Sequence, residues 1–147
     1  MDAAYDRWAA FYDSYDNPMV FMASQAIDAS IGDLAGVRAA FEFGCGTGRN
    51  LELLRLRGVA SLSGCDLSVG MLDVARQRCP GVHLFLHDMT WPLPSETAPV
   101  DLALFCLTLE HVADLTAPLA QARRIVCPGG RIAIFEIHPF TSALGKN

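Results

Sequence analysis

The sequence predicts an α/β fold built on a parallel sheet that helices cover on both faces. From residue 38 onward, short apolar runs alternate with segments of helical pattern, which is typical of repeated strand–helix–strand units. Hydrophobic residues make up 52% of the 147 residues, and this excess fits strands that are buried on both sides. Three glycines at alternating positions separate the first apolar run from a helical segment, and glycine lets backbone approach a ligand closely.

Two helices are expected before the sheet, at residues 3–15 and 18–31. Aromatic side chains recur at helical spacing in the first of them and form one face, which favours core packing. Pro18 separates the two helices, because proline disfavours the helical conformation in the residue before it. We expect this lead-in, residues 1–35, to precede a core at residues 36–147.

Five strands should alternate with helices in the core. Ser68 is placed to cap the second of these helices, and Pro-Gly pairs follow the second and third. Crossovers between parallel strands are right-handed, and ligands bind at the carboxyl ends of such strands. The strands are expected at residues 39–43, 61–65, 82–87, 100–107 and 131–137, and the helices at residues 49–57, 68–78 and 116–126.

Composition argues against several classes of protein. The net charge is −5 and the basic residues are scattered, so the sequence carries no electrostatic footprint for nucleic acid. No apolar run approaches the roughly 18 residues of a membrane span, and the acidic N-terminus is unlike a signal peptide, so we expect no membrane partner and a cytoplasmic location. The 5 cysteines form no CxxC pair, which favours core packing over a metal site or disulfides. No linker or repeat divides the chain, so residues 1–147 should form a single domain.

The sequence spacing between the glycine turn and the next carboxylate indicates a type of ligand. Asp66 lies 18 residues beyond Gly48, at the end of the next expected strand. This spacing is typical of a carboxylate that binds a ribose hydroxyl in nucleotide sites. The turn reads G-x-G-x-G rather than G-x-G-x-x-G, which disfavours a dinucleotide dehydrogenase. The sequence therefore predicts a ligand built on adenosine.

Five motifs follow one another along the chain, and together with a lead-in they carry a family resemblance. They are Glu42-Phe43-Gly44-Cys45-Gly46-Thr47-Gly48, Gly64-Cys65-Asp66-Leu67-Ser68-Val69-Gly70-Met71-Leu72, His87-Asp88-Met89, residues 101–111, and Cys127-Pro128-Gly129-Gly130-Arg131, preceded by Tyr5-Asp6-x-x-Ala9-x-x-Tyr12-Asp13. In this order the chain resembles the class I S-adenosylmethionine-dependent methyltransferases, in particular those that act on small molecules. The resemblance implies a Rossmann-like, doubly wound parallel sheet with strand order 3-2-1-4-5. It also implies S-adenosylmethionine as cofactor, S-adenosylhomocysteine as product and a small-molecule acceptor.

The resemblance also implies roles for individual residues in binding the cofactor. Asp66 would accept hydrogen bonds from both ribose hydroxyls, and Asp88 from the adenine amine. Three further sets of residues would surround the methionine half, the adenine and the methyl group of the cofactor. These are Gly44, Cys45, Gly46, Thr47 and Gly48 for the methionine half; Leu67, Met71 and Met89 for the adenine; and Phe105 and Cys106 beside the sulfonium methyl.

For three residues of the expected site, the sequence leaves two interpretations open. Tyr5 and Tyr12 belong to the aromatic face, but the resemblance implies a lid over the methionine end. His111 is the best candidate for a general base, because imidazole titrates near neutral pH, although a structural role is the commoner one for a lone histidine. A base is needed only if the acceptor must lose a proton, and no metal site is expected.

The chain departs from the family pattern after its fifth strand. The resemblance implies two more strands, an antiparallel hairpin, and much of the usual acceptor-binding region, all of which this sequence lacks. The strand at residues 131–137 would then be an apolar edge with unpaired backbone, open to a homodimer or a completing partner. Three other interpretations are compatible with the sequence: the chain is a piece of a longer protein, a binding module without turnover, or an enzyme that uses the cofactor for other chemistry.

Overall fold

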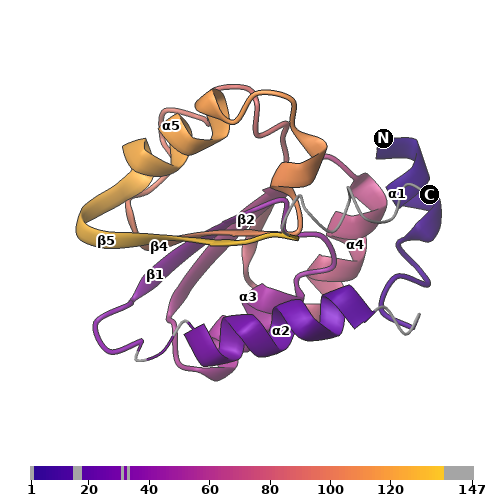
Figure 1. Cartoon of the computed structure of the whole chain (residues 1–147), viewed down its shortest axis with the longest axis horizontal. Coiled ribbons are helices and arrows are strands. Elements are labelled where there is room, and N and C mark those ends of the chain that lie inside the picture. The colour runs from indigo at the N-terminus through magenta and orange to yellow at the C-terminus, as the bar shows by residue number, and fades with distance from the viewer. Residues whose placement is uncertain (1, 15–17, 31, 33, 138–147) are drawn as a thin grey trace.

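The computed structural model describes residues 2–14, 18–30, 32 and 34–137. At its centre lies a five-stranded sheet in the order β3-β2-β1-β4-β5, with every neighbouring pair parallel (Figure 1). This confirms the α/β fold class and the strand order expected from the sequence. The strands are β1 (Ala39–Phe43), β2 (Ser61–Asp66), β3 (His83–Leu86), β4 (Val100–Cys106) and β5 (Val126–Phe135).

Helices cover both faces of the sheet, as expected. Three of them, α2 (Pro18–Ser30), α3 (Arg49–Leu56) and α4 (Val69–Arg78), pack on one face, and α5 (Thr116–Ile125) packs on the other (Figure 1). The short helix α1 (Asp2–Trp8) lies beside α4, and a 3₁₀ turn, η1 (Leu109–His111), follows β4. No helix in the part of the chain that the structure describes is long and apolar enough to cross a membrane.

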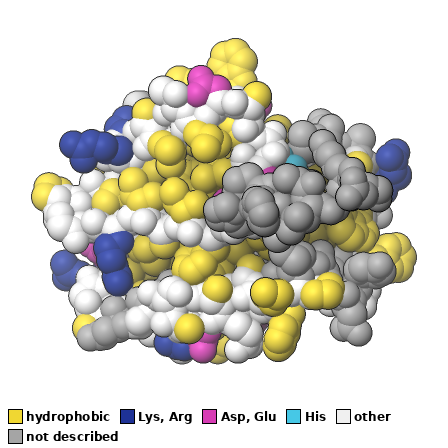
Figure 2. Space-filling model, in the orientation of Figure 1, with side chains coloured by type: hydrophobic (Ala, Val, Ile, Leu, Met, Phe, Trp, Pro, Cys, Tyr) yellow, Lys and Arg dark blue, Asp and Glu magenta, His cyan; other side chains and the backbone are white. Residues whose placement is uncertain are grey.

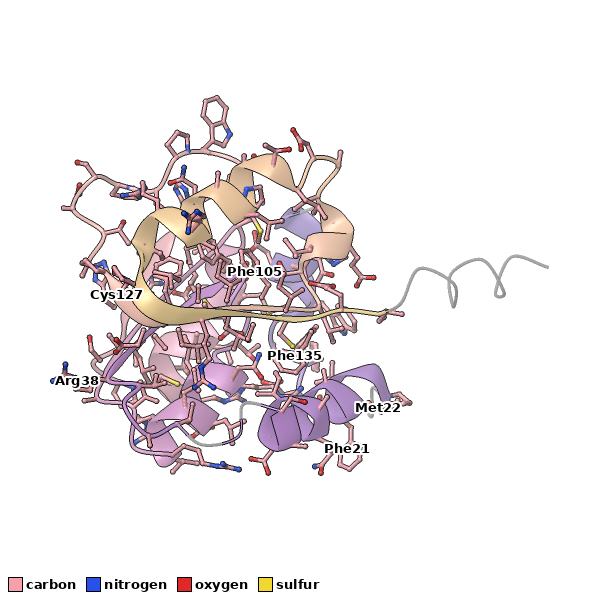
Figure 3. All side chains as sticks on the ribbon, turned by 60° about the vertical axis from the view of Figure 1, so that its left-hand side comes forward. Phe21, Met22, Arg38, Phe105, Cys127 and Phe135 are labelled. Carbon is pink, nitrogen blue, oxygen red and sulfur yellow. The ribbon has the colours of Figure 1, made fainter. Side chains whose placement is uncertain are left out.

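Alternation along the strands divides the core into two clusters. In β4, Leu102 and Leu104 face α3, whereas Ala103 and Phe105 face α5. Figure 3 shows the same division around β5, with Phe105 on one side of the ribbon and Phe135 on the other. Successive side chains of a strand point to opposite faces, so a sheet buried on both sides needs apolar residues without alternation.

The first expected helix is wrong beyond Trp8. Residues 9–14 form turns in which amides bond carbonyls three residues back, as in Phe11 N to Trp8 O (2.9 Å) and Ser14 N to Phe11 O (3.1 Å). Tyr15 lies outside the described residues. The tighter path brings Asp13 to the glycine turn, where it pairs with Arg78. This tertiary contact prevails over the helical spacing of the aromatic residues.

The fifth strand begins earlier than expected and ends earlier too. β5 starts at Val126 rather than Arg131, because Val126 pairs with Val100 and a register shift follows before Arg131 meets Leu102. Such an irregularity tolerates Pro128, which has no amide hydrogen to donate. The expected strand ran to residue 137, but pairing stops at Phe135.

Candidate functional site

A cavity of about 320 Å³ opens at the carboxyl ends of β1, β2 and β4, where the sequence places the site. This volume is within the range of small-molecule sites. The structure brings most of the expected residues together in its wall: Tyr5, Tyr12, Gly44, Gly46, Asp66, Leu67, Met71, Asp88, Met89, Cys106 and His111. A smaller cavity of about 60 Å³ shares part of this wall and adds Cys45 and Thr47.

The glycine turn connects the two cavities, and its three glycines differ in the space that a Cβ would have. All three have positive φ, at 66° for Gly44, 51° for Gly46 and 77° for Gly48. A Cβ at Gly44 would lie 2.1 Å from Thr108 Oγ1, so only glycine lets β1 approach that residue. A Cβ at Gly46 would meet no atom within 4 Å, and this residue lines both cavities. Gly48 lines neither, since it packs against Ala75 of α4.

Asp66 joins the glycine turn to the end of β2. Its Oδ2 accepts a hydrogen bond from Gly46 N (2.8 Å), and its Oδ1 accepts one from Ser68 N (2.9 Å). Burial raises the pKa of this carboxyl, and the amide hydrogen bonds partly offset that rise. A carboxylate has about four acceptor positions, so Asp66 can accept hydrogen bonds from a ligand as well.

The far wall of the larger cavity comes from β3 and α4. Asp88 Oδ1 accepts from Thr90 N (2.8 Å) and Thr90 Oγ1 (2.7 Å), and this turn holds the carboxylate at the cavity rim. Met71 and Met89 are buried and Leu67 is half exposed, so they offer apolar surface between Asp66 and Asp88. The arrangement suits a flat, partly apolar group with polar edges.

Glu42 is a feature that the expected site residues did not include. Its side chain is buried on the α3 face of β1, where Oε1 accepts from Asn50 Nδ2 (2.6 Å). Oε2 is buried without a hydrogen-bond partner among the described residues. Burial raises the pKa of Glu42 to about 8, and the residue lines the smaller cavity. A buried unpaired acceptor beside a cavity favours a ligand that donates hydrogen bonds.

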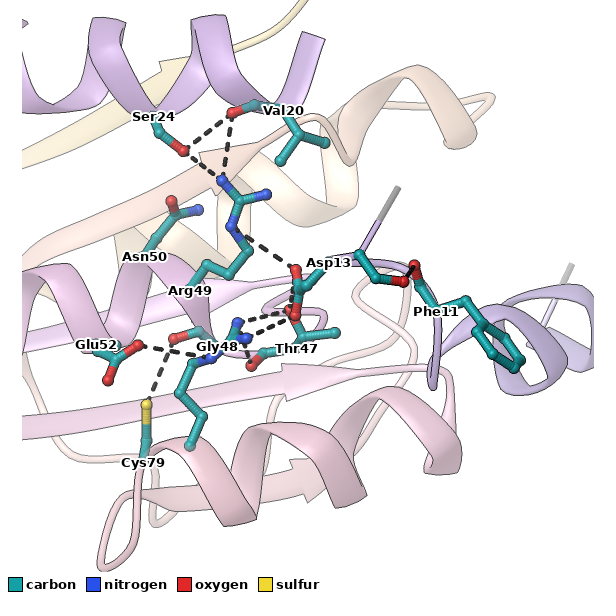
Figure 4. A network of polar contacts seen from close by, with 12 residues as sticks. Phe11, Asp13, Val20, Ser24, Thr47, Gly48, Arg49, Asn50, Glu52 and Cys79 are labelled. Atoms are coloured by element: carbon teal, nitrogen blue, oxygen red, sulfur yellow. Dashed lines mark hydrogen bonds and ion pairs between the residues drawn. The ribbon is translucent and has the colours of Figure 1, made fainter. Parts of the chain in front are cut away.

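A polar network fastens the N-terminal segment to the glycine turn (Figure 4). Asp13 accepts from Thr47 Oγ1 (3.2 Å) and from Arg78 (2.7 Å), and Arg49 Nε lies 3.8 Å from the same carboxylate. Arg49 also donates to Ser24 Oγ of α2 (2.6 Å). These pairs are half-buried, and such networks contribute more than isolated surface pairs. Asp13 belongs to the N-terminal lead-in motif, but the motif by itself predicted no role for this residue.

The two expected tyrosines reach the cavity from the N-terminal segment. Tyr12 lines both cavities, and burial raises its pKa to about 12. Tyr5 of α1 lines the larger cavity, and its hydroxyl lies 2.9 Å from His111 Nε2. His111 is thus held at the cavity wall by a residue that lies 106 positions earlier in the chain.

Phe105 lies away from the cavity that it was expected to flank. Its side chain is fully buried and stacks on Phe43 with 4.6 Å between ring centroids, because its position in β4 points it toward α5. Cys106 lines the cavity as expected, together with residues that were not predicted as site residues: Leu107, Thr108, Val112, Ser68, His87 and Thr90. Leu107 has a positive φ of 52°, which is uncommon for a residue with a Cβ and ends the strand abruptly at the cavity.

The chain matches known proteins along most of its length. Residues 41–134 match a family model described as a methyltransferase domain. A malonyl-[acyl-carrier protein] O-methyltransferase of Serratia marcescens is 35% identical over 88% of this chain and 49% of its own length. A demethylmenaquinone methyltransferase of Tropheryma whipplei is 30% identical over 92% of this chain and 58% of its own. The chain therefore spans about half the length of these curated relatives.

Solved structures agree with the fold. An S-adenosylmethionine-dependent methyltransferase from Mesorhizobium loti is 29% identical, covers 78% of this chain and 53% of that one, and superposes with a TM-score of 0.68. The structure described as a DhpI-SAM-HEP complex has 23% identity, covers 99% of this chain and 70% of that one, and has a TM-score of 0.75, which supports the fold alone. The ordered motifs, the strand order and the family match lead to one conclusion: the chain belongs to the methyltransferase domain family, with the fold of its class I S-adenosylmethionine-dependent members.

Proposed function

We propose that this chain binds S-adenosylmethionine in the larger cavity and transfers its methyl group to a small-molecule acceptor. The observation that carries the proposal is the hydrogen bond from Gly46 N to Asp66 Oδ2, which joins the glycine turn and the strand-end carboxylate in one cavity wall. The family match supports the same activity.

The residues present fit this cofactor at both of its ends. Asp66 would accept from the ribose hydroxyls, and Asp88 with the apolar Met71 surface would hold the adenine. The amino-acid end would lie at Gly46, which lines both cavities, and would reach into the smaller one, where the unpaired Oε2 of Glu42 would accept from the ammonium group. A cationic donor would also favour the ionised form of Glu42, whose burial otherwise raises its pKa.

The cofactor supplies an activated methyl group on a sulfonium, so the protein's own work is chiefly binding and orientation. Holding two reactants in line provides effective molarities of about 10⁵–10⁸ M in favourable cases. Tyr12 and Tyr5 line the cavity from the N-terminal segment, where they would cover a bound cofactor. Cys106 and Thr108 form the wall at the end of β4, where an acceptor would have to approach.

Calorimetry with S-adenosylmethionine, S-adenosylhomocysteine and NAD tests the binding half of this proposal. We expect Asp66→Ala to weaken binding of the first two about ten- to hundred-fold, since a hydrogen bond to a charged group contributes about 1.5–3 kcal/mol. Asp73→Ala is the matched control, because Asp73 lies exposed on α4 beside Arg76. Unchanged affinity in Asp66→Ala, or preference for NAD, would contradict the site.

Transfer itself needs a separate measurement. The chain covers about half of its curated relatives, and part of an acceptor site can lie in the other half. Incubation with methyl-labelled S-adenosylmethionine and a panel of small hydroxyl, amine and carboxylate compounds should label at least one acceptor. Tight cofactor binding with no labelled product from any compound would instead favour a binding module.

We also propose that β5 pairs in antiparallel fashion with β5 of a second copy of this chain. Among the described residues β5 has only β4 as a neighbouring strand, so its other edge offers backbone groups to a further strand. Figure 2 shows hydrophobic side chains gathered on both sides of this edge. A two-fold axis at Ala133 would place Ile132 (40% exposed) opposite Ile134 (47% exposed) of the second copy. In this register no two side chains of like charge would lie directly opposite each other.

Light scattering on Ile134→Lys tests this pairing. We expect the parent chain to be a dimer at micromolar concentration and the variant to be a monomer, because two lysines would then lie close to the axis. Leu56→Lys, on an exposed residue of α3, should leave the dimer intact. A parent chain that is monomeric, with β5 amides protected from hydrogen exchange, would contradict pairing with a second copy.

A further inference from the structure

The hydrogen bond between Tyr5 and His111 joins two residues that line the larger cavity. Tyr5 Oη lies 2.9 Å from His111 Nε2, and the two rings meet edge to face at 5.7 Å. Both residues line the cavity near Thr108 and Val112, on the side of β4. Any acceptor that enters on this side meets the tyrosine hydroxyl and the imidazole as a pair.

The chemistry of the two groups decides which of them donates. Burial, together with the negative charges of Glu110 and Asp66, raises the pKa of Tyr5, so its phenol keeps its proton at neutral pH. A phenol is the stronger donor and an imidazole nitrogen the stronger acceptor of the pair. This chemistry favours donation from Tyr5 to Nε2, with the proton of a neutral ring on Nδ1.

Contacts of the neighbouring residue hold Tyr5 in place. Asp6 Oδ1 accepts hydrogen bonds from Ser68 Oγ and from Gly70 N (2.9 Å) at the start of α4. A Cβ at Gly70 would come within 2.9 Å of Asp6 O, so glycine is needed for α1 to lie this close. Ser68 N in turn donates to Asp66 Oδ1. A continuous series of contacts thus links the carboxylate at the end of β2 to the histidine after β4.

We propose, building on the function proposed above, that Tyr5 relays a proton from the acceptor to His111, and that the acceptor carries a hydroxyl group. In this step the O–H bond of the acceptor breaks as the methyl group is transferred, and its proton passes to Tyr5 Oη. The tyrosine's own proton passes to His111 Nε2, and the acceptor's heteroatom keeps the electron pair that it needs for the methyl group. The imidazolium forms with Glu110 Oε1 at 3.8 Å from Nε2, where the carboxylate stabilises it.

An acceptor that is already an anion gains nothing from this relay. A carboxylate has no proton to lose at neutral pH, and it would enter a cavity that Asp66 and Asp88 already make negative. The relay therefore predicts a substrate class, a neutral compound with a hydroxyl group. It also gives α1 a role beyond covering the cavity, because removal of α1 would remove the relay.

The tautomer of His111 tests the inference without any turnover. In ¹⁵N spectra of the complete chain with a neutral imidazole, we expect the Nδ1–H tautomer to predominate at His111, with the signal assigned through His111→Gln. Tyr5→Phe should lower the ratio of Nδ1–H to Nε2–H about five-fold, the factor that a net hydrogen bond of about 1 kcal/mol represents. Tyr12→Phe is the matched control and should leave the ratio unchanged. A parent chain with the Nε2–H tautomer, or a Tyr5→Phe variant with the parent's ratio, would overturn the relay.

Asp6→Ala tests whether the docking of α1 positions Tyr5. We expect it to change the tautomer ratio in the same direction as Tyr5→Phe, whereas Asp73→Ala should not change it. A parent-like ratio in Asp6→Ala would contradict the role of α1. Calorimetry with S-adenosylhomocysteine on the same samples separates the two proposals, because failure to bind would contradict the proposed function while the tautomer still reports on Tyr5.

Discussion

The inner strands and the outer edge of this sheet are built in opposite ways. Around β1 both faces are covered, β2, β1 and β4 each have two neighbouring strands, and the glycine turn is hydrogen-bonded to Asp66 and Asp13. At β5 one edge has no neighbouring strand among the described residues, and Ile132 and Ile134 are exposed. The proposed cofactor site lies at the inner strands, whereas the proposed pairing with a second copy would use the open edge of β5.

Truncating one apolar side chain in each region should give the largest contrast. Phe105→Ala removes a fully buried ring that stacks on Phe43, and we expect a loss of about 3–5 kcal/mol in the free energy of unfolding. Ile134→Ala at the outer edge should change it by about 0.5 kcal/mol or less in the monomer. Urea unfolding measures both at dilute concentration. Equal losses would show that the outer edge is as well packed as the centre.

Glu42 should make the stability of the inner strands depend on pH. Burial raises its pKa from 4.5 in a model compound to about 8 in the folded state. Between these values the folded state keeps a proton that the unfolded state has lost, so stability falls as pH rises, by at most about 1.4 kcal/mol per pH unit from this group. Above about pH 8 the loss levels off.

Unfolding of the parent chain and of Glu42→Gln at several pH values checks this expectation. The variant should gain relative stability from pH 5 to pH 8, because its side chain cannot ionise, while Asn50 can still donate to its oxygen. Parallel curves for the two proteins would show that Glu42 ionises normally. Saturating S-adenosylmethionine should reduce the difference if its ammonium group meets Oε2.

A pair of glycine substitutions should show a smaller contrast. Gly44 in the inner turn and Gly129 in β5 both have positive φ, at 66° and 84°. Each glycine-to-alanine change carries the backbone strain of about 1–3 kcal/mol, but only at Gly44 would the Cβ collide with Thr108, at 2.1 Å from Oγ1. We expect Gly44→Ala to lose more stability and to weaken cofactor binding. Equal losses would mean that Thr108 moves aside at little cost.

The sequence predicted the fold well where local pattern is sufficient. An apolar run that ends at the glycine turn placed β1 at its observed bounds, and the Ser68 cap is confirmed by its hydrogen bond from Met71 N (3.1 Å). The glycine turn and Asp66 could be predicted as neighbours, because the carboxyl ends of parallel strands meet at one edge. The start of β5 could not, since pairing of Val126 with Val100 depends on a strand far away in the sequence.

The residue types and their order determined that this chain forms a doubly wound parallel sheet with a nucleotide-type turn at its centre. The periodicity of apolar residues indicates which side chains are buried, and the spacing of glycines indicates where the backbone turns. Only the tertiary structure decided that Phe105 points into the core, that Glu42 keeps an unpaired oxygen, and that Tyr5 meets His111. These contacts join segments far apart in the chain, and their geometry depends on how whole helices pack against the sheet rather than on any local pattern.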